Sequence, residues 1–244
     1  MNLRKVIYFL LIALVISSCE KLKNCDESFK INDSMLLNAK ANKTISFKAI
    51  KLKNLPCELF ELDELEELDL FNTDLKSLTS DIGKLENLKR LNLSWNEISS
   101  FPTELFELKK LETLIIYGAP KEDLELPNIS GIKKLNKLKE LDLSSYTFKI
   151  FPSEIIEIKS LEKLNLSSVG LTKIPDEIGN LINLKKLSIQ VNPEIEELPK
   201  SMKKLINLKE LWMSGTGVYQ SDVNKLSQAL PNCEIHFSPN YGKE

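Results

Sequence analysis

The chain has 244 residues, enough for one domain of ordinary size or one elongated array of repeats. Hydrophobic residues make up 42% of it and charged residues 28%, a composition that excludes an intrinsically disordered chain and an integral membrane protein. The formal net charge is -2, and Lys and Glu are interspersed without a basic stripe, so we expect no nucleic-acid binding.

Residues 1–18 have the features of an export signal. Arg4 and Lys5 precede an apolar run of 11 residues, Val6–Ile16, which is too short to cross a hydrocarbon layer of about 30 Å as a helix. A charged start followed by a short apolar run is typical of a signal peptide. We therefore exclude this segment from the fold.

Cys19 stands directly after Ile16-Ser17-Ser18. This arrangement resembles the lipobox of bacterial lipoproteins, although Leu is more common there in place of Ile16, and Gly or Ala in place of Ser18. The resemblance implies a lipid on Cys19 that holds an exported protein at the cell envelope or cell surface, since several acyl chains anchor durably. The alternative is an ordinary signal peptide, with Cys19 incidental.

Residues 19–41 show no clear period. We expect their first part to be a polar tether that leaves the membrane surface. The terminal repeat of a solenoid exposes an unpaired apolar face. The part around Phe29–Leu37 is therefore expected to fold over that face as an N-terminal cap.

A regular period occupies residues 42–218. The steps between leading positions are 23 residues, except for the fourth, which is 27, and the last, which is 24. The eight leading positions are Asn42, Leu65, Leu88, Leu111, Leu138, Leu161, Leu184 and Leu208. Such a period decides the fold before any local pattern does.

Each copy follows the pattern LxxLxLxxNxLxxLPxxIxxLxN, seen clearly in Leu88–Lys110. The array therefore resembles leucine-rich repeat proteins of the 23-residue class. The resemblance implies an α/β solenoid, curved and right-handed, with a parallel sheet on its concave face and short helical or 3-10 turns on its convex face. It also implies protein binding as the commonest role, although a fold does not give a function.

The residues of each copy support this architecture independently. A short strand carries two inward apolar residues at alternate positions, such as Leu68 and Leu70. One copy cannot bury them alone, whereas copies stacked about 4.8 Å apart build a continuous sheet and core. The Leu-Pro segment that follows, as in Leu55-Pro56, forms the return, where no sheet donor is needed. Short helical turns are expected there, for instance over Glu104–Leu108.

Two departures from the pattern matter. The consensus Asn occurs only at Asn96 and Asn192, so backbone groups of the other turns need other partners, such as water. The fourth copy carries four extra residues within 117–130, which maps to a loop on one face of the solenoid. That loop either contributes to binding or is a tolerated insertion.

Residues 219–244 are expected to form a C-terminal cap and tail. Ser221–Leu230 has a helical pattern, with Ser221 as the N-cap residue. Cys233–Phe237 is then predicted to be a last strand.

Little in the chain points to catalysis. The single histidine, His236, lies in the predicted last strand without a second metal ligand or a partner nucleophile, so a structural role is favoured. We expect no enzyme activity, metal or other cofactor. Cys25 and Cys57 both lie near the N-terminal end of the array and either form a disulfide or stay free, since export brings oxidising conditions. Cys233 lies too far away to pair with them and is expected to be a buried cap thiol.

The repeat phase predicts which side chains point outward from the concave face. They stand at the third, fifth and seventh positions of each copy, and the eighth position lies near the end of the strand. Most are small and polar, but apolar and aromatic residues gather in copies two to four. The candidate partner-binding residues are Asp69, Phe71, Arg90, Asn92, Trp95, Ile115 and Tyr117, with Trp212 apart near the C-terminal end. An exposed aromatic group with a polar rim resembles an interface hot spot. The alternative is that Phe71 and Trp95 fold back to cover a loop or the sheet edge.

We therefore predict an exported, lipid-anchored protein that binds a protein or glycan through its concave face, and we expect it to be a monomer. The alternative is a structural protein of the cell envelope with no dedicated ligand.

Overall fold

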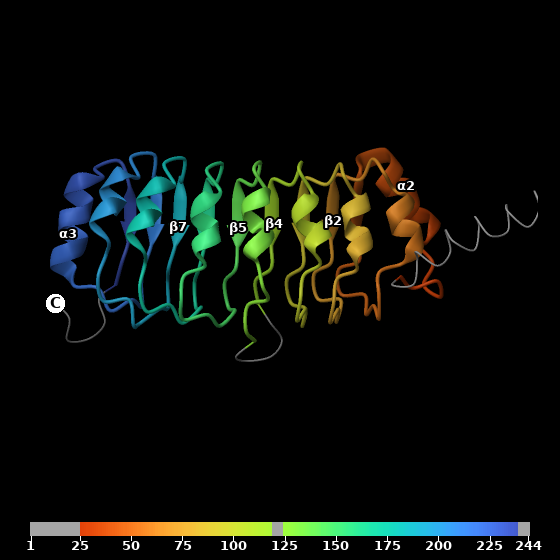
Figure 1. The fold of residues 1–244 in the computed structure, drawn as a ribbon, viewed down its shortest axis with the longest axis horizontal. Helices are drawn as coiled ribbons and strands as arrows, with labels where there is room; N and C mark the ends of the chain where they lie inside the picture. Colours follow the sequence, from red (N-terminus) through yellow and green to blue (C-terminus); the bar gives the residue numbers. More distant parts are fainter. Residues whose placement is uncertain (1–24, 119–123, 239–244) are drawn as a thin grey trace, which may run out of the picture.

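A single nine-stranded parallel sheet runs through the protein in the computed structural model, which describes residues 25–118 and 124–238. The strands stack in sequence order between helix α2 at one end and helix α3 at the other (Figure 1). They are β1 Thr44–Ser46, β2 Glu67–Asp69, β3 Arg90–Asn92, β4 Thr113–Ile115, β5 Glu140–Asp142, β6 Lys163–Asn165, β7 Lys186–Ser188, β8 Glu210–Trp212 and β9 Glu234–His236.

The core lies behind this sheet and follows the repeat. The middle residue of each strand from β1 to β8, and the residue two places later, are at most 2% exposed. The register places equivalent residues opposite each other, as with Leu68, Leu91 and Leu114. Parallel stacking therefore buries every copy's leucines against those of its neighbours. The predicted solenoid with a parallel sheet is confirmed.

Short 3-10 helices line the return side, as expected. They are η1 Cys57–Glu61, η2 Ser80–Lys84, η3 Thr103–Glu107, η4 Ser130–Lys134, η5 Ser153–Glu157, η6 Asp176–Asn180 and η7 Lys200–Lys204. The residue before five of them is a proline, such as Pro102, with φ -69° and ψ 150°. Proline fixes φ and lacks an N–H, which suits the start of a helix, where the first N–H groups have no intrahelical partner.

The N-terminal segment covers the open end of the core. Helix α2, Asp33–Asn42, packs against β1, and Ile31 and Ala39 are buried there. The Asn32 side chain caps this helix by accepting a hydrogen bond from the Met35 N–H at 3.0 Å.

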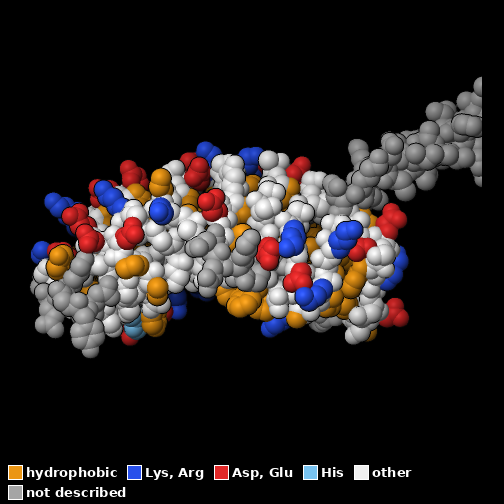
Figure 2. All heavy atoms as spheres, turned by 90° about the horizontal axis from the view of Figure 1, so that it is seen from below, with side chains coloured by type: hydrophobic (Ala, Val, Ile, Leu, Met, Phe, Trp, Pro, Cys, Tyr) orange, Lys and Arg blue, Asp and Glu red, His pale blue; other side chains and the backbone are white. Residues whose placement is uncertain are grey.

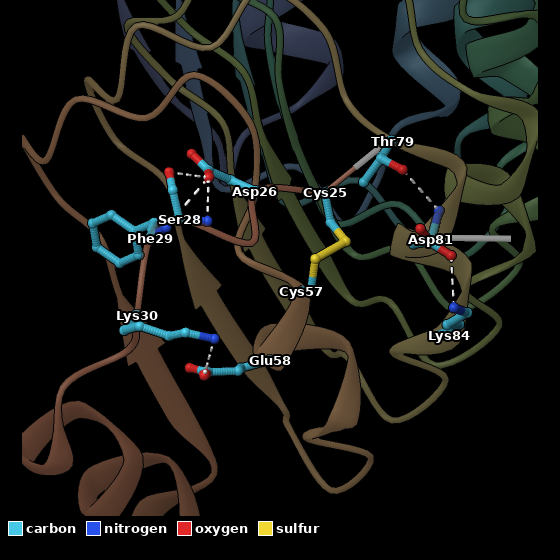
Figure 3. Close-up of a disulfide and its surroundings, with 10 residues drawn as sticks. All are labelled: Cys25, Asp26, Ser28, Phe29, Lys30, Cys57, Glu58, Thr79, Asp81 and Lys84. Carbon is cyan, nitrogen blue, oxygen red and sulfur yellow. Dashed lines mark hydrogen bonds and ion pairs between the residues drawn. A yellow bond between two sulfur atoms is a disulfide. The ribbon is translucent and has the colours of Figure 1, made fainter. Parts of the chain in front are cut away.

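A disulfide joins Cys25 to Cys57 and so ties this segment to η1, with Cα atoms 5.0 Å apart (Figure 3). The bridge that the sequence left open is present. Beside it, Glu58 pairs with Lys30 at 3.1 Å and accepts the Ile31 N–H at 3.1 Å. These links, together with the Asp26 N–H that donates to the Leu55 carbonyl at 2.8 Å, hold the segment in place.

The C-terminal end is closed by α3, Gln220–Ala229, and the expected last strand, β9. The prediction that Ser221 is the N-cap residue was wrong. The N–H groups of Asp222 and Val223 bond to the carbonyl of Tyr219, so Tyr219, two residues earlier, is the N-cap residue and Ser221 lies inside the first turn. Cys233 is half-buried rather than buried, and burial raises the pKa of its thiol to about 11.

Asparagines at the consensus position bond backbone groups of adjacent turns. The Asn96 Oδ1 accepts the N–H groups of Thr73 and Leu75, at 3.1 and 3.0 Å. Its Nδ2 donates to carbonyls in both copies, including that of Leu70 at 2.7 Å. Where Thr replaces Asn, the hydroxyl takes part of this role, as Thr216 does by donating to the Met213 carbonyl at 2.9 Å.

The eighth residue of every copy adopts a left-handed backbone, a feature that the sequence did not suggest. The φ values lie between 54° and 77° at Ala49, Asn72, Trp95, Gly118, Ser145, Ser168, Val191 and Gly215. This conformation ends each strand and aims the residue's N–H at the next copy, as where Val191 donates to the Ser214 carbonyl at 2.9 Å.

Residues 1–24, 119–123 and 239–244 lie outside the described residues. The predicted signal peptide, the predicted lipidation site Cys19, part of the predicted tether and part of the 117–130 insertion therefore fall outside them. Within the described ranges, no helix has the length and apolar character needed to cross a bilayer.

Candidate binding surface

The concave face, meaning the solvent side of the sheet, is organised in rows that run across the strands. The row of fifth positions places Asp69 on β2, Asn92 on β3 and Ile115 on β4 side by side. Arg90 is adjacent, in the row of third positions. The structure therefore brings these four predicted residues together.

Hydrogen bonds fix the polar members of this group. The Asn92 Nδ2 donates to Asp69 Oδ1 at 3.0 Å. Each of the two side chains also accepts the N–H two residues later, Asp69 from Phe71 and Asn92 from Ser94, both at 3.0 Å. These side chains are held rigidly before any ligand arrives.

Two aromatic rings lie beside them. The ring centroids of Phe71 and Trp95 are 6.3 Å apart at an interplanar angle of 41°, and the Lys48 Nζ lies 5.2 Å from the Phe71 centroid. We call Lys48, Phe71 and Trp95 the aromatic cluster. Trp95 is 41% exposed, whereas Phe71 is half-buried. Hydrophobic side chains gather beside the hollowed middle of the molecule seen in Figure 2.

The Trp95 indole rests on the turn after β4. The backbone N–H of Trp95 donates to the carbonyls of Tyr117 and Gly118 in this turn, at 3.0 and 2.8 Å. A Cβ atom on Gly118 would lie 2.6 Å from the indole Nε1, so only a glycine leaves room for the ring there. Trp95 thus covers this turn and still exposes two-fifths of its surface.

The remaining predicted residues divide between this region and the far end. Ile115 and Tyr117 are half-buried on β4 and the segment after it. Beyond the aromatic cluster, a hollow of about 270 Å³ includes Ser46, Asp69 and Arg90 in its lining. Trp212 lies on β8, five strands from β3, which is about 24 Å at the usual strand spacing.

Trp212 has a partner that was not foreseen. Its ring stacks on His236 with centroids 3.6 Å apart and an interplanar angle of 13°. His236 is the fifth-position residue of a ninth strand, opposite Trp212 in the register. The sequence contains one sign of this ninth copy, because Trp212 and His236 are 24 residues apart, the same step as that from Leu184 to Leu208. The copy is hard to recognise because Asn232 replaces the leading leucine.

Charges at the edge of this face neutralise one another. The second position alternates between Lys and Glu through most copies, and Glu66 pairs with Lys89 at 2.6 Å and Lys43 at 3.4 Å. The hydrogen bond from Lys89, and more weakly that from Lys43, hold the pKa of the Glu66 carboxyl below its usual value. The same pairing joins Glu162 to Lys185 at 2.7 Å. The alternation was visible in the sequence but became meaningful only once the register was known.

Among residues 25–118 and 124–238, no group of three His, Cys, Asp or Glu side chains is placed to hold a metal ion.

Comparison with known proteins agrees with the repeat pattern. Residues 121–233 match the family described as a leucine-rich repeat region, and residues 87–108 match the single leucine-rich repeat. No sequence among curated proteins matches the chain.

Solved structures share the architecture. A leucine-rich repeat protein of Leptospira interrogans is 25% identical with a TM-score of 0.54, over 79% of this chain and 60% of that one. Internalin C2 of Listeria monocytogenes is 23% identical with a TM-score of 0.59, over 78% and 79%. The Arabidopsis receptor kinase HAESA, in complex with a peptide hormone and a co-receptor, is 24% identical with a TM-score of 0.66, over 81% and 34%. The chain thus spans less than two thirds of the Leptospira protein and about a third of the plant receptor.

Proposed function

Because the chain is a leucine-rich repeat protein, we propose that it binds a protein partner through its concave face, with the aromatic cluster at the centre of the contact. Leucine-rich repeat proteins are generally binding scaffolds rather than enzymes. The specific partner residues proposed are those around Phe71 and Trp95, together with Asp69, Arg90 and Asn92.

The observation that carries this proposal is the fixed, exposed indole of Trp95. Binding hot spots are rich in Trp, Tyr and Arg, and a side chain that is already held loses little entropy on binding. The Trp95 ring packs beside Phe71 and against Gly118, yet 41% of the residue faces solvent. Asp69 and Asn92 supply a rigid polar rim.

The plant receptor in the comparison is in complex with a peptide hormone and a co-receptor. This supports a polypeptide partner here.

The test is capture of a partner from the cells that produce the protein, after crosslinking. Trp95→Ala and Tyr117→Ala are expected to reduce capture of the same partner at least about tenfold, the cost of losing a hot-spot residue. Ile182→Ala is the matched control, because Ile182 is 55% exposed but lies outside the strands, in the segment after η6.

The outcome that contradicts the proposal is unchanged capture by both variants when circular dichroism shows that they are folded. That result would favour the second role, a structural protein of the cell envelope. One observation suits the second role: the polar groups of the concave face largely satisfy one another, as where Asn165 donates to Asp142 at 3.0 Å.

We also propose that the protein is exported and held at a membrane by a lipid on Cys19. The support is the sequence of residues 1–19, a charged start, a short apolar run and a cysteine after two serines. A labelled fatty acid should be incorporated into the natural chain and not into Cys19→Ser. Equal labelling of both chains would contradict the anchor.

A further inference from the structure

Two contacts fix the orientation of the Trp212 indole, which lies at the C-terminal end of the concave face. One face of the ring stacks on His236, at 3.6 Å between centroids. The Nε1 donates to Glu210 at 3.3 Å, and Glu210 in turn pairs with Lys186 at 2.6 Å. These bonds to Lys186 and Trp212 keep the pKa of the Glu210 carboxyl below its usual value, so it stays charged and keeps the indole in place. In Figure 2 the histidine, in pale blue, lies beside hydrophobic atoms near the end away from α2.

The free face of Trp212 borders a hollow. The hollow measures about 190 Å³ and is lined by residues of β5, β6 and β7, with Trp212 as the contribution from β8. His236, on β9, is not among the lining residues, because it covers the opposite face of the indole. Trp212 is therefore the end wall of the hollow.

The floor of the hollow carries a row of polar side chains that are already held in place. Asp142, Asn165 and Ser188 lie side by side in the row of fifth positions. The Asn165 Nδ2 donates to Asp142 Oδ2 at 3.0 Å, and the Ser188 hydroxyl lies 2.6 Å from that of Ser167. A carboxylate has about four acceptor sites. Asp142 also accepts the N–H and the hydroxyl of Ser144, at 2.9 and 2.6 Å. Three of its acceptor sites are therefore used, and about one remains for a ligand hydroxyl.

The charges around the hollow balance. Glu140 and Asp142 face Lys163 and Lys186, so the lining carries as many acidic as basic groups. Lys163 pairs with Glu140 at 3.2 Å, and Lys186 pairs with Glu210. A charged ligand would have to displace one of these partners, whereas a neutral ligand leaves them in place.

We propose that this hollow binds one neutral pyranose ring of a glycan. A pyranose presents an apolar face of C–H groups, which suits the indole, and a rim of hydroxyls, which suits Asp142, Asn165 and Ser188. An aromatic or aliphatic side chain would fill the same space but remove water from these polar groups without replacing its hydrogen bonds, which is unfavourable. The volume is below the roughly 300–1,000 Å³ of sites for drug-sized ligands, so a single ring fits.

This site goes beyond the proposed protein partner and is independent of it, since Trp212 lies about 24 Å from Trp95 by strand spacing. The two roles can fail separately. The chain also has only two tryptophans, so Trp95→Phe leaves Trp212 as the sole indole fluorophore.

The experiment titrates purified Trp95→Phe protein with methyl glycosides of glucose, galactose, mannose and N-acetylglucosamine while following Trp212 fluorescence. At least one glycoside is expected to bind with a millimolar Kd, the range for a small ligand. Saturation-transfer NMR then compares the natural chain with Trp212→Ala and with Ser188→Leu, which fills the hollow but keeps the tryptophan. Both are expected to weaken binding at least about tenfold, whereas Phe71→Ala is expected to bind as the natural chain does.

The proposal is overturned if no neutral glycoside changes the Trp212 signal up to about 50 mM, far above the expected range. It is also overturned if Ser188→Leu binds the glycoside unchanged, or if glucuronate or a tyrosine-containing peptide competes more strongly than every neutral glycoside. Binding of a neutral polysaccharide is then compared with binding of a protein that carries neutral glycans. This comparison identifies which kind of molecule supplies the pyranose ring.

Discussion

At the scale of single residues, a few side chains hold adjacent copies together. Asn96 is 1% exposed and satisfies backbone groups in its own copy and in the preceding one. The sequence identified this residue as one of two that keep the consensus, and the structure shows why the position matters. The eighth position of each copy shows no such preference for one residue type. Residues as different as Ala49, Trp95 and Val191 adopt the left-handed backbone there.

Asn96→Ala is expected to lower the free energy of unfolding by about 3 kcal/mol, because buried N–H and carbonyl groups lose their partner. Urea unfolding followed by circular dichroism measures the change. Asn136→Ala, at an exposed position in another turn, is the control and should shift the value by less than about 0.5 kcal/mol. Equal shifts would show that the buried asparagine is not what joins the turns.

Val191→Asn is expected to raise the free energy of unfolding by about 1 kcal/mol. Val191 has φ 55° and is 58% exposed, so a β-branched residue stands in the left-handed region with little packing to compensate. Asn tolerates this conformation better than Val does. The control is Ile150→Asn, at an exposed β-branched residue whose φ is negative, where no gain is expected. A thermal melt of both variants decides between relief of backbone strain and a general effect of added polarity.

At the scale of elements, the N-terminal cap depends on one covalent link and a few polar ones. α2 has a weakly apolar sequence and buries Ala39 alone among its residues. The disulfide from Cys25 to Cys57 closes a loop with a sequence separation of 32 and therefore restricts the unfolded segment strongly.

Replacing Cys25 and Cys57 together by Ser is expected to destabilise the cap by about 3–4 kcal/mol, the range for loops of this length. In a solenoid each copy contacts only its neighbours, so the loss should be local. Amide hydrogen exchange is the measurement: protection should fall in α2 and β1 and persist in α3. Cys233→Ser serves as the control. A uniform loss of protection along the whole array would contradict the local interpretation.

At the scale of the whole molecule, ion pairs between copies keep the surface nearly neutral and link stability to pH. Glu107 pairs with Lys134 at 2.6 Å and Lys109 at 2.9 Å, and these two cations lower the pKa of its carboxyl from 4.5 to about 2. The pKa values of the Glu66 and Glu162 carboxyls are also lowered, by hydrogen bonds from Lys89 and Lys185 respectively. Exposed pairs of this kind contribute little one by one, but many act together.

Stability is therefore expected to fall in acid. The folded pKa of Glu107 lies below its unfolded value, so the folded state binds fewer protons between pH 4.5 and about 2. The contribution is complete above pH 4.5 and is lost as the pH falls toward 2. Urea midpoints across this range should decrease less in Glu107→Gln than in the natural chain. Glu86→Gln, at a carboxyl for which the described residues show no ion pair, should follow the natural chain. Parallel curves for all three would contradict this origin.

Much of the fold can be predicted from the sequence because every copy carries the same structural pattern. The inward leucines, the turn prolines and the strand register are all encoded within one copy and then repeated, so reading one copy correctly predicts the others. The position of Arg90 beside Glu67, for example, follows from the step of 23 residues alone. The N-cap of α3 was misplaced because hydrogen bonds to Tyr219, and not the residue type of Ser221, set where that helix begins.

By itself, then, the sequence determined the repeat, the parallel sheet and the set of side chains that leave its concave face, because burial of apolar residues at a fixed period allows one arrangement. Only the tertiary structure decided how those side chains meet. It seated Trp95 on Gly118, stacked Trp212 on His236 and closed the bridge between Cys25 and Cys57. Each of these contacts joins different copies or a copy and a cap, and depends on ring orientation and turn geometry that no single copy encodes.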